Sequence, residues 1–131
     1  MRKVAVLLAL VLLPLTPSAT ALPSGTRVET YRSGLAFPVD MAWVTGTKKI
    51  FFTEKNSGRV RIMVGKRLLD RPCVDLDVVS DGERGALGIA LHPNFKDNHH
   101  LYVYYTNRSP LDNRVTRFTV RNNRCTDANH I

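Results

Sequence analysis

Beyond its first fifteen residues, the sequence contains no apolar run approaching the roughly 18 continuous apolar residues that a membrane-spanning helix requires. The rest of the chain is therefore not expected to be an integral membrane protein. It also lacks any long stretch with apolar residues at the 3.6-residue period of an amphipathic helix. That absence leaves all-β as the predicted fold class.

Acidic residues are few: 11 Asp and Glu stand against 19 Lys and Arg in 131 residues, which gives a net charge of +8. A basic balance can indicate a nucleic-acid or anionic-membrane partner. Here the Lys and Arg residues are scattered among strands and turns, and no basic patch interleaved with aromatic residues is present. We therefore expect a solvated basic surface and no nucleic-acid partner.

The first 21 residues have the three-part pattern of a secretory signal peptide. Arg2 and Lys3 precede an apolar run over residues 4–15, and residues 19–21 form a small-residue cleavage site. The apolar run is too short for a membrane anchor, and no cysteine lies directly after it as a lipoprotein would require. We predict cleavage after Ala21 and a secreted or periplasmic mature chain of residues 22–131.

The only two cysteines, Cys73 and Cys125, both lie in the mature part of the chain. In an exported protein such a pair is most simply a disulfide, which would connect distant parts of the sequence. The alternative of two buried or free thiols stays open, because pairing does not follow from the sequence alone.

From residue 35 onward, short runs rich in Val, Ile, Phe, Tyr and Thr alternate with turn residues. Such runs are typical of strands on a partly buried, pleated surface, and the Gly and Asn residues between them permit tight reversals. The predicted strands are residues 39–44, 49–54, 59–64, 67–69, 74–79, 87–91, 101–106 and 113–120.

These runs also repeat along the chain. Residues 41–43 match 89–91, and residues 50–53 match 102–105. A period near fifty residues with three or four strands per unit is the signature of β-propeller blades. We therefore predict a first blade and most of a second, in an incomplete propeller whose next strand is expected beyond Ile131. A two-sheet β-sandwich of residues 22–131 is the alternative.

The order of these motifs resembles the glucose/sorbosone dehydrogenase family, the soluble sugar dehydrogenases that depend on pyrroloquinoline quinone (PQQ). Residues 34–43 and 50–61 are similar to the strands of that family's first blade. Residues 81–95 are similar to its most specific element, and residues 102–118 contain two further motifs at the expected spacing. Ala86 stands where the family usually has leucine, a departure that does not touch the chemistry. The chain is identified as an N-terminal fragment of such a protein.

The resemblance implies an exported enzyme that oxidises a sugar hemiacetal or alcohol. Its cofactors would be PQQ, which accepts hydride, and calcium, which polarises the quinone; its partners would be the sugar and an external electron acceptor. The family's catalytic histidine and its calcium ligands come from later blades, so no catalytic or metal-binding residue is assigned, and the fragment alone is expected to be inactive. A non-catalytic secreted propeller that binds protein or carbohydrate is the alternative.

Within the chain, the resemblance selects the loop over residues 82–88, which should connect the two blades at the mouth of the central channel. Glu83 corresponds to a position that contacts PQQ in relatives, and Arg84 beside it is the second cofactor-binding candidate. The alternative is a local turn ordered by a pair between Glu83 and Arg84.

The remaining polar residues are assigned no chemistry. His92 is expected to set a turn, and the adjacent His99 and His100 would diverge on a strand and so could not share a metal. Three aspartates alternate without the spacing of a calcium loop, which predicts a solvated strand edge. They are Asp75, Asp77 and Asp81.

Overall fold

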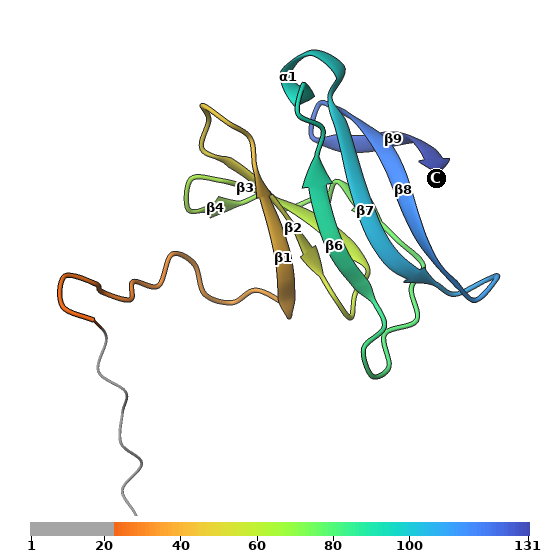
Figure 1. Cartoon of the computed structure of the whole chain (residues 1–131), viewed down its shortest axis with the longest axis horizontal. Coiled ribbons are helices and arrows are strands. Elements are labelled where there is room, and N and C mark those ends of the chain that lie inside the picture. The colour runs from red at the N-terminus through yellow and green to blue at the C-terminus, as the bar shows by residue number, and fades with distance from the viewer. Residues whose placement is uncertain (1–22) are drawn as a thin grey trace, which may run out of the picture.

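The computed structural model describes residues 23–131, so the predicted signal peptide over residues 1–21 lies outside the described part of the chain. Residues 23–37 form a lead-in segment without strands or helices (Figure 1). Two antiparallel sheets follow, and within each sheet the strands pair in chain order. Among residues 23–131, no helix is long and apolar enough to cross a membrane.

The first sheet begins with β1 (Pro38–Trp43), β2 (Lys49–Glu54) and β3 (Arg59–Val64). Its fourth position is divided: β4 (Arg67–Leu68) pairs with the end of β3, and β5 (Val74–Asp75) pairs with its beginning. The interruption includes Pro72, which has no backbone N–H to donate to a ladder.

The strand predicted over residues 74–79 is wrong beyond Asp75. After that residue the chain leaves the first sheet and crosses to the second. Val78 is buried in the core and makes only an isolated bridge to Asn107. Val78 is therefore apolar because it is buried in the crossover segment, and not because it belongs to a strand.

The second sheet consists of β6 (Ala86–Leu91), β7 (His100–Asn107), β8 (Asp112–Arg121) and β9 (Arg124–His130). A four-residue helix, α1 (Phe95–Asn98), which the sequence did not predict, lies between β6 and β7. The presence of β9 corrects the expectation that the outermost strand of this sheet follows Ile131. β9 is polar and almost wholly exposed, because only its backbone is needed to pair with β8.

The inner strands of the two sheets carry the same irregularity. The pairing of β1 with β2 shifts register between Pro38 and Asp40, and the pairing of β6 with β7 shifts between Ala86 and Gly88. A bulge bends a strand and changes the direction of its side chains. Its repetition at the same place supports the prediction that the two sheets are copies of one unit.

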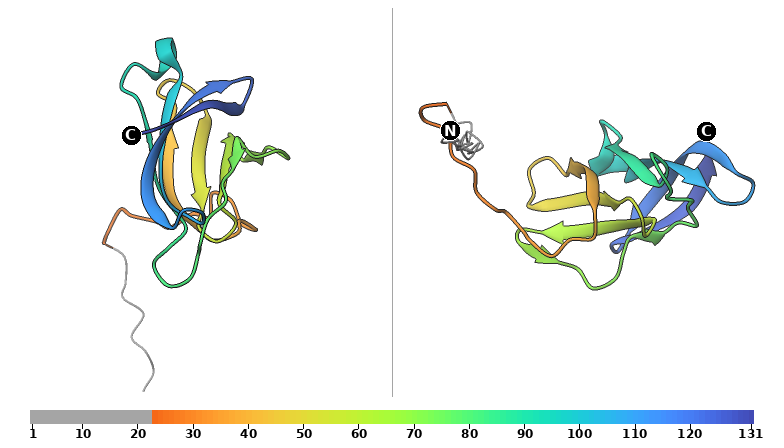
Figure 2. Two further views of the ribbon diagram at one scale, coloured as in Figure 1. Left: turned by 90° about the vertical axis from the view of Figure 1, so that its right-hand side faces the viewer. Right: turned by 90° about the horizontal axis from the view of Figure 1, so that it is seen from below.

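The two sheets pack against each other with β1 and β6 adjacent, as Figures 1 and 2 show. One apolar cluster fills the space between them, and alternate residues of the central strands supply it, as the period of a strand requires. Its buried members are Val44, Phe51, Val60, Ile62, Cys73 and Val78 from the first sheet and crossover, and Ala86, Ile89, Leu101, Val103, Tyr105, Phe118 and Val120 from the second sheet.

The opposite face of the first sheet is apolar as well. Ile50, Phe52 and Met63 are buried there, whereas Met41 and Trp43 remain 53% and 58% exposed. A β-sandwich keeps its apolar faces inside and its outer faces polar. The apolar outer face and the meander connectivity therefore contradict the sandwich alternative and are typical of blades that pack side by side.

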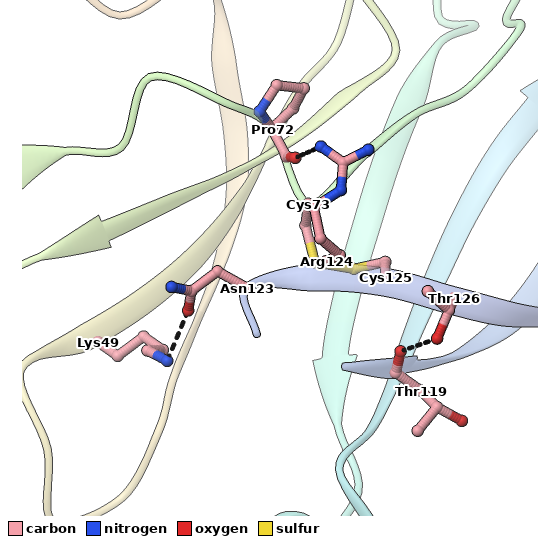
Figure 3. Close-up of a disulfide and its surroundings, with 8 residues drawn as sticks. All are labelled: Lys49, Pro72, Cys73, Thr119, Asn123, Arg124, Cys125 and Thr126. Carbon is pink, nitrogen blue, oxygen red and sulfur yellow. Dashed lines mark hydrogen bonds between the residues drawn. A yellow bond between two sulfur atoms is a disulfide. The ribbon is translucent and has the colours of Figure 1, made fainter. Parts of the chain in front are cut away.

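Cys73 and Cys125 form a disulfide with a Cα–Cα distance of 4.9 Å, which confirms the predicted pairing (Figure 3). Beside it, the backbone N–H of Cys125 donates to the carbonyl oxygen of Cys73 over 2.9 Å. Arg124 also donates through Nη1 to the carbonyl oxygen of Pro72 over 3.2 Å. The disulfide thus joins the residue directly before β5 to β9, at the edge of the molecule farthest along each sheet from β1 and β6.

A buried ion pair lies on the outer face of the first sheet. The Glu54 carboxylate is 3.4 Å from Nη1 of Arg61, and their side chains are only 2% and 12% exposed. Ser57 donates through Oγ to the same carboxylate over 3.1 Å, and Arg61 donates through Nη2 to the carbonyl oxygen of Leu69 over 3.1 Å. The pair therefore connects β2 and β3 to the segment between β4 and β5.

Candidate functional site

The loop over residues 81–85 connects the first sheet to β6 at the end of the molecule opposite α1 (Figure 1). It starts with a turn in which the N–H of Arg84 donates to the carbonyl oxygen of Asp81 over 3.1 Å. Gly82 and Gly85 have positive φ angles of 56° and 137°. A Cβ at Gly85 would lie 2.5 Å from the main-chain oxygen of Lys55, whereas nothing lies within 4 Å of one at Gly82.

Lys55, which follows β2, contacts both ends of this loop. Its main-chain oxygen accepts a hydrogen bond from the N–H of Ala86 over 3.0 Å, and its Nζ donates to the carbonyl oxygen of Gly82. The carbonyl oxygen of Gly85 accepts from the N–H of Thr106 on β7 over 3.0 Å. The loop is therefore attached to both sheets.

Two more hydrogen bonds hold the beginning of β6 on the first sheet. Thr53 donates through Oγ1 to the carbonyl oxygen of Leu87 over 2.9 Å. The N–H of Ile89 donates to Oδ2 of Asp40 on β1, also over 2.9 Å. These bonds involve backbone groups in and beside the bulge of β6, where the strand pairing is irregular. Side chains of the neighbouring sheet thus provide hydrogen-bond partners for these backbone groups.

The two predicted cofactor-binding residues, Glu83 and Arg84, are both exposed in the loop. Arg84 is paired with Asp81 over 3.3 Å, because the turn brings residues three apart together. The local turn of the alternative interpretation is therefore present, but Arg84 and Asp81 order it and a Glu83–Arg84 pair does not form. Within residues 23–131, the Glu83 carboxylate has no hydrogen-bond partner, which leaves it available to a ligand.

Sequence reasoning missed Lys55 and Asp40, the two side chains that fix the loop and β6. Lys55 belongs to the motif over residues 50–61, but nothing in that motif indicates a contact with Gly82, which is 27 residues away. Asp40 is similarly distant from Ile89, at 49 residues. Both contacts depend on how the two sheets pack.

Substituting Gly85 by alanine is expected to lower the free energy of unfolding by about 3 kcal/mol, because alanine strongly disfavours a φ of 137° and its Cβ would overlap the Lys55 oxygen. Gly82→Ala is the matched control: its site is open, so only the ordinary penalty of about 1 kcal/mol for a left-handed residue applies. Urea titrations that gave equal losses at both positions would contradict this prediction.

The three alternating aspartates each pair with an arginine. Asp75 lies 3.3 Å from Arg59 of β3, and Asp77 lies 2.7 Å from Arg108 of the turn between β7 and β8. Asp81 pairs with Arg84, as described above. All three pairs are exposed, and residues 23–131 contain no group of three or more His, Cys, Asp or Glu side chains placed to hold a metal ion. Asp77 thus joins the crossover segment to the turn between β7 and β8, whereas the pairs of Asp75 and Asp81 lie within the first sheet and within the loop.

The histidines near α1 have structural roles. Nδ1 of His92 accepts from the backbone N–H of Asn94 over 3.0 Å and lies 2.8 Å from Nδ2 of Asn98, which confirms that His92 sets a turn. His99 ends α1 in a left-handed conformation, and His100 begins β7. These histidines lie at the end of the sheets away from the loop over residues 81–85.

His100 predicts a pH dependence of stability. Partial burial, followed by the electrostatic influence of Arg117, His92 and His99, lowers the pKa of His100 below its usual value of about 6.5. The unfolded chain therefore binds this proton more tightly, so acid favours unfolding as the pH falls below about 6.5. His100→Gln is expected to flatten the fall in stability between pH 7 and pH 5 in urea titrations. Unchanged slopes would contradict the assignment.

Two surface grooves, of about 540 and 620 Å³, lie at the α1 end of the molecule. The first is lined by residues 42–45 and 91–97, and the second by Lys49, Phe51, Phe95, His99 and residues 120–123. Neither groove includes a residue of the loop over residues 81–85. The candidate site is therefore an exposed loop, and it is not enclosed by the described residues.

The family model described as Glucose / Sorbosone dehydrogenase matches residues 35–131. Among curated proteins, the Hedgehog-interacting proteins of Mus musculus and Homo sapiens are each 36% identical to the chain, over 109 and 104 residues. These matches cover 71% and 67% of the chain but only 15% of either relative, so the chain spans a small part of their length.

Solved structures with the same fold include a putative oxidoreductase (glucose dehydrogenase) of Thermus thermophilus, with 31% identity and a TM-score of 0.71. The PQQ-bound aldose sugar dehydrogenase of Streptomyces coelicolor has 24% identity and a TM-score of 0.69. Both similarities cover 79% of this chain and 31% or 32% of the other. The likeness confirms the predicted all-β propeller fold, of which the two sheets are blades, and the chain spans about a third of those structures' length.

Proposed function

The chain belongs to the glucose/sorbosone dehydrogenase family, and we propose that it supplies the first two blades of an exported, PQQ-dependent sugar dehydrogenase. The observation that carries this proposal is the family match over residues 35–131, which includes the loop with Glu83. The whole protein is proposed to be a polypeptide that contains residues 23–131 together with the remaining blades of the propeller. The described residues alone are proposed to be inactive.

The described residues fit one side of a PQQ site. PQQ is a planar quinone with carboxylates and a ring N–H, so it needs both cationic donors and an acceptor. The loop presents the free Glu83 carboxylate, and the cation of Lys55 lies beside Gly82. The open space at Gly82 would let a flat ligand approach the main chain. Calcium ligands and the other walls of the site are assigned to the remaining blades.

The chemistry divides between cofactor and protein. When bound, PQQ would supply the acceptor for the hydride removed from the sugar carbon, with calcium as the polarising ion and an external electron acceptor as partner. The contribution of this chain is orientation: Glu83 would accept a hydrogen bond from the ligand, and Arg84 would stay paired with Asp81. The base that takes the sugar hydroxyl proton is assigned to another blade, because no histidine among residues 23–131 lies on the loop.

A fluorescence titration of the whole protein with PQQ in the presence of calcium tests this function. We expect saturable binding that weakens about tenfold in Glu83→Ala, the loss of one charged hydrogen bond, and that is largely retained in Glu83→Gln. Glu29→Ala is the matched control, since this carboxylate lies in the lead-in segment, 61% exposed, and pairs only with the exposed Arg27 and Lys66. A whole protein that binds no PQQ would refute the proposal and favour a non-catalytic binding propeller.

Export is proposed from the N-terminal sequence pattern. Mature protein recovered from the periplasm or medium is expected to begin at Leu22, which N-terminal sequencing would establish. Recovery of an unprocessed chain from the cytosol would contradict the proposed signal peptide.

A further inference from the structure

We infer that Lys55 is a positioning residue that holds the loop over residues 81–85 so that Glu83 faces the cofactor site. The inference rests on the proposed function for the role of Glu83, but not for the contacts that Lys55 makes. Lys55 is the residue of the first blade that reaches both ends of this loop, with its carbonyl at Ala86 and its ammonium at Gly82.

The main chain of Lys55 fixes the far end of the loop. Its carbonyl oxygen accepts from the N–H of Ala86, and it lies so close to Gly85 that a side chain there would be excluded. The Gly85 carbonyl in turn accepts from Thr106. The exit of the loop into β6 is therefore held by backbone contacts that any residue at position 55 could provide.

The side chain of Lys55 fixes the near end. Its Nζ donates to the carbonyl oxygen of Gly82, the residue directly before Glu83. Gly82 is exposed and has a positive φ, and nothing surrounds it within 4 Å of a Cβ position. A free loop of this kind would sample many conformations, so a single charged hydrogen bond has a large share in ordering it.

Lys55 is itself held in place by Phe37. The carbonyl oxygen of Phe37 accepts from the N–H of Lys55 over 3.1 Å, and the Lys55 Nζ lies 5.5 Å from the centre of the Phe37 ring. Phe37 has a φ of 54°, which is unusual for a bulky residue and costs conformational energy. Such a backbone conformation occurs where the surrounding structure requires it. Here it puts Phe37 in the position from which it holds Lys55.

Hydrogen–deuterium exchange on the whole protein tests the inference without any cofactor. In Lys55→Met, the amide of Arg84, which donates to the carbonyl oxygen of Asp81 within the loop, is expected to exchange about tenfold faster, because one charged hydrogen bond that orders the loop is lost. The amides of Ala86 and Thr106 should keep their protection, since their acceptors are main-chain oxygens, and this shows that the fold is intact. Lys55→Arg, which retains a donor, should restore most of the protection of the Arg84 amide.

The matched control is Lys66→Met. Lys66 also lies over an aromatic ring, with its Nζ 5.6 Å from the centre of the Tyr31 ring, but it is on the turn before β4 and does not contact the loop. In a PQQ titration, Lys55→Met should weaken binding about tenfold and Lys66→Met should leave it unchanged. Unchanged exchange at the Arg84 amide in Lys55→Met would overturn the inference. Faster exchange in Lys55→Met, in a protein whose wild type binds no PQQ, would support the loop contact and refute the proposed function instead.

Discussion

Replacing Cys73 and Cys125 together by alanine is expected to lower the free energy of unfolding by about 4 kcal/mol. The disulfide closes a loop of 52 residues, and the chain-entropy model of cross-links gives about this value for a loop of that length. The loss of stability should be largest at the outer edge of the molecule, where the disulfide and the adjacent backbone hydrogen bond join Cys73, directly before β5, to β9 (Figure 3). The hydrogen bonds of Thr53 and Asp40 to β6 remain.

Urea titrations of the whole protein, followed by circular dichroism, measure this effect. Addition of a reductant should destabilise the wild type to the level of the double variant and leave the double variant unchanged. Hydrogen exchange should accelerate in β9 and around Cys73 before it does in β1 and β6. Equal unfolding midpoints for the oxidised wild type and the variant would contradict the predicted stabilisation by the disulfide.

Glu54→Gln is expected to lower the free energy of unfolding by about 3 kcal/mol, for a different reason. The substitution keeps the shape of the side chain but leaves the Arg61 guanidinium buried without its counter-charge. Nε of Arg61 already has no partner among the described residues, so the cation has little compensation left. The loss should appear as a lower urea midpoint for the whole protein.

The exposed pair of Arg59 and Asp75 provides the control, because Arg59 lies on the same strand as Arg61. Their side chains are 47% and 57% exposed, and Asp75→Asn is expected to cost less than about 1 kcal/mol. Replacing both buried partners, in Glu54→Met with Arg61→Met, should recover most of the stability, since the pair lies beside the apolar residues Phe52 and Met63. A Glu54→Gln loss no larger than that of Asp75→Asn would refute the assignment of a buried, uncompensated charge.

Much of the fold was predictable because its central strands have a strong local pattern. β2 and β3 have the predicted bounds. Both strands have apolar residues on their two faces, and Gly58 marks the turn between them. β9 was missed because it is an edge strand with exposed polar side chains, and only its backbone pairing with β8 makes it a strand. The error over residues 76–79 has the opposite cause, since three of these four residues are apolar but belong to no strand, and Val78 makes only an isolated bridge.

The candidate site divides in the same way. The family resemblance of residues 81–95 selected Glu83 and Arg84, because a motif of adjacent residues is visible in the sequence. The pairing of Arg84 with Asp81 required the geometry of the turn, and the roles of Lys55 and Asp40 required the packing of one sheet on the other.

By itself, the sequence determined that the chain is all-β, that its strands repeat as blades, and to which family it belongs, because these properties depend on residues close together in the chain. Only the tertiary structure decided that Cys73 meets Cys125, that Glu54 and Arg61 form a buried pair, and that Lys55 holds the loop with Glu83. Each of these contacts depends on distance and burial in the folded molecule, and neither quantity is written in the local pattern of residues.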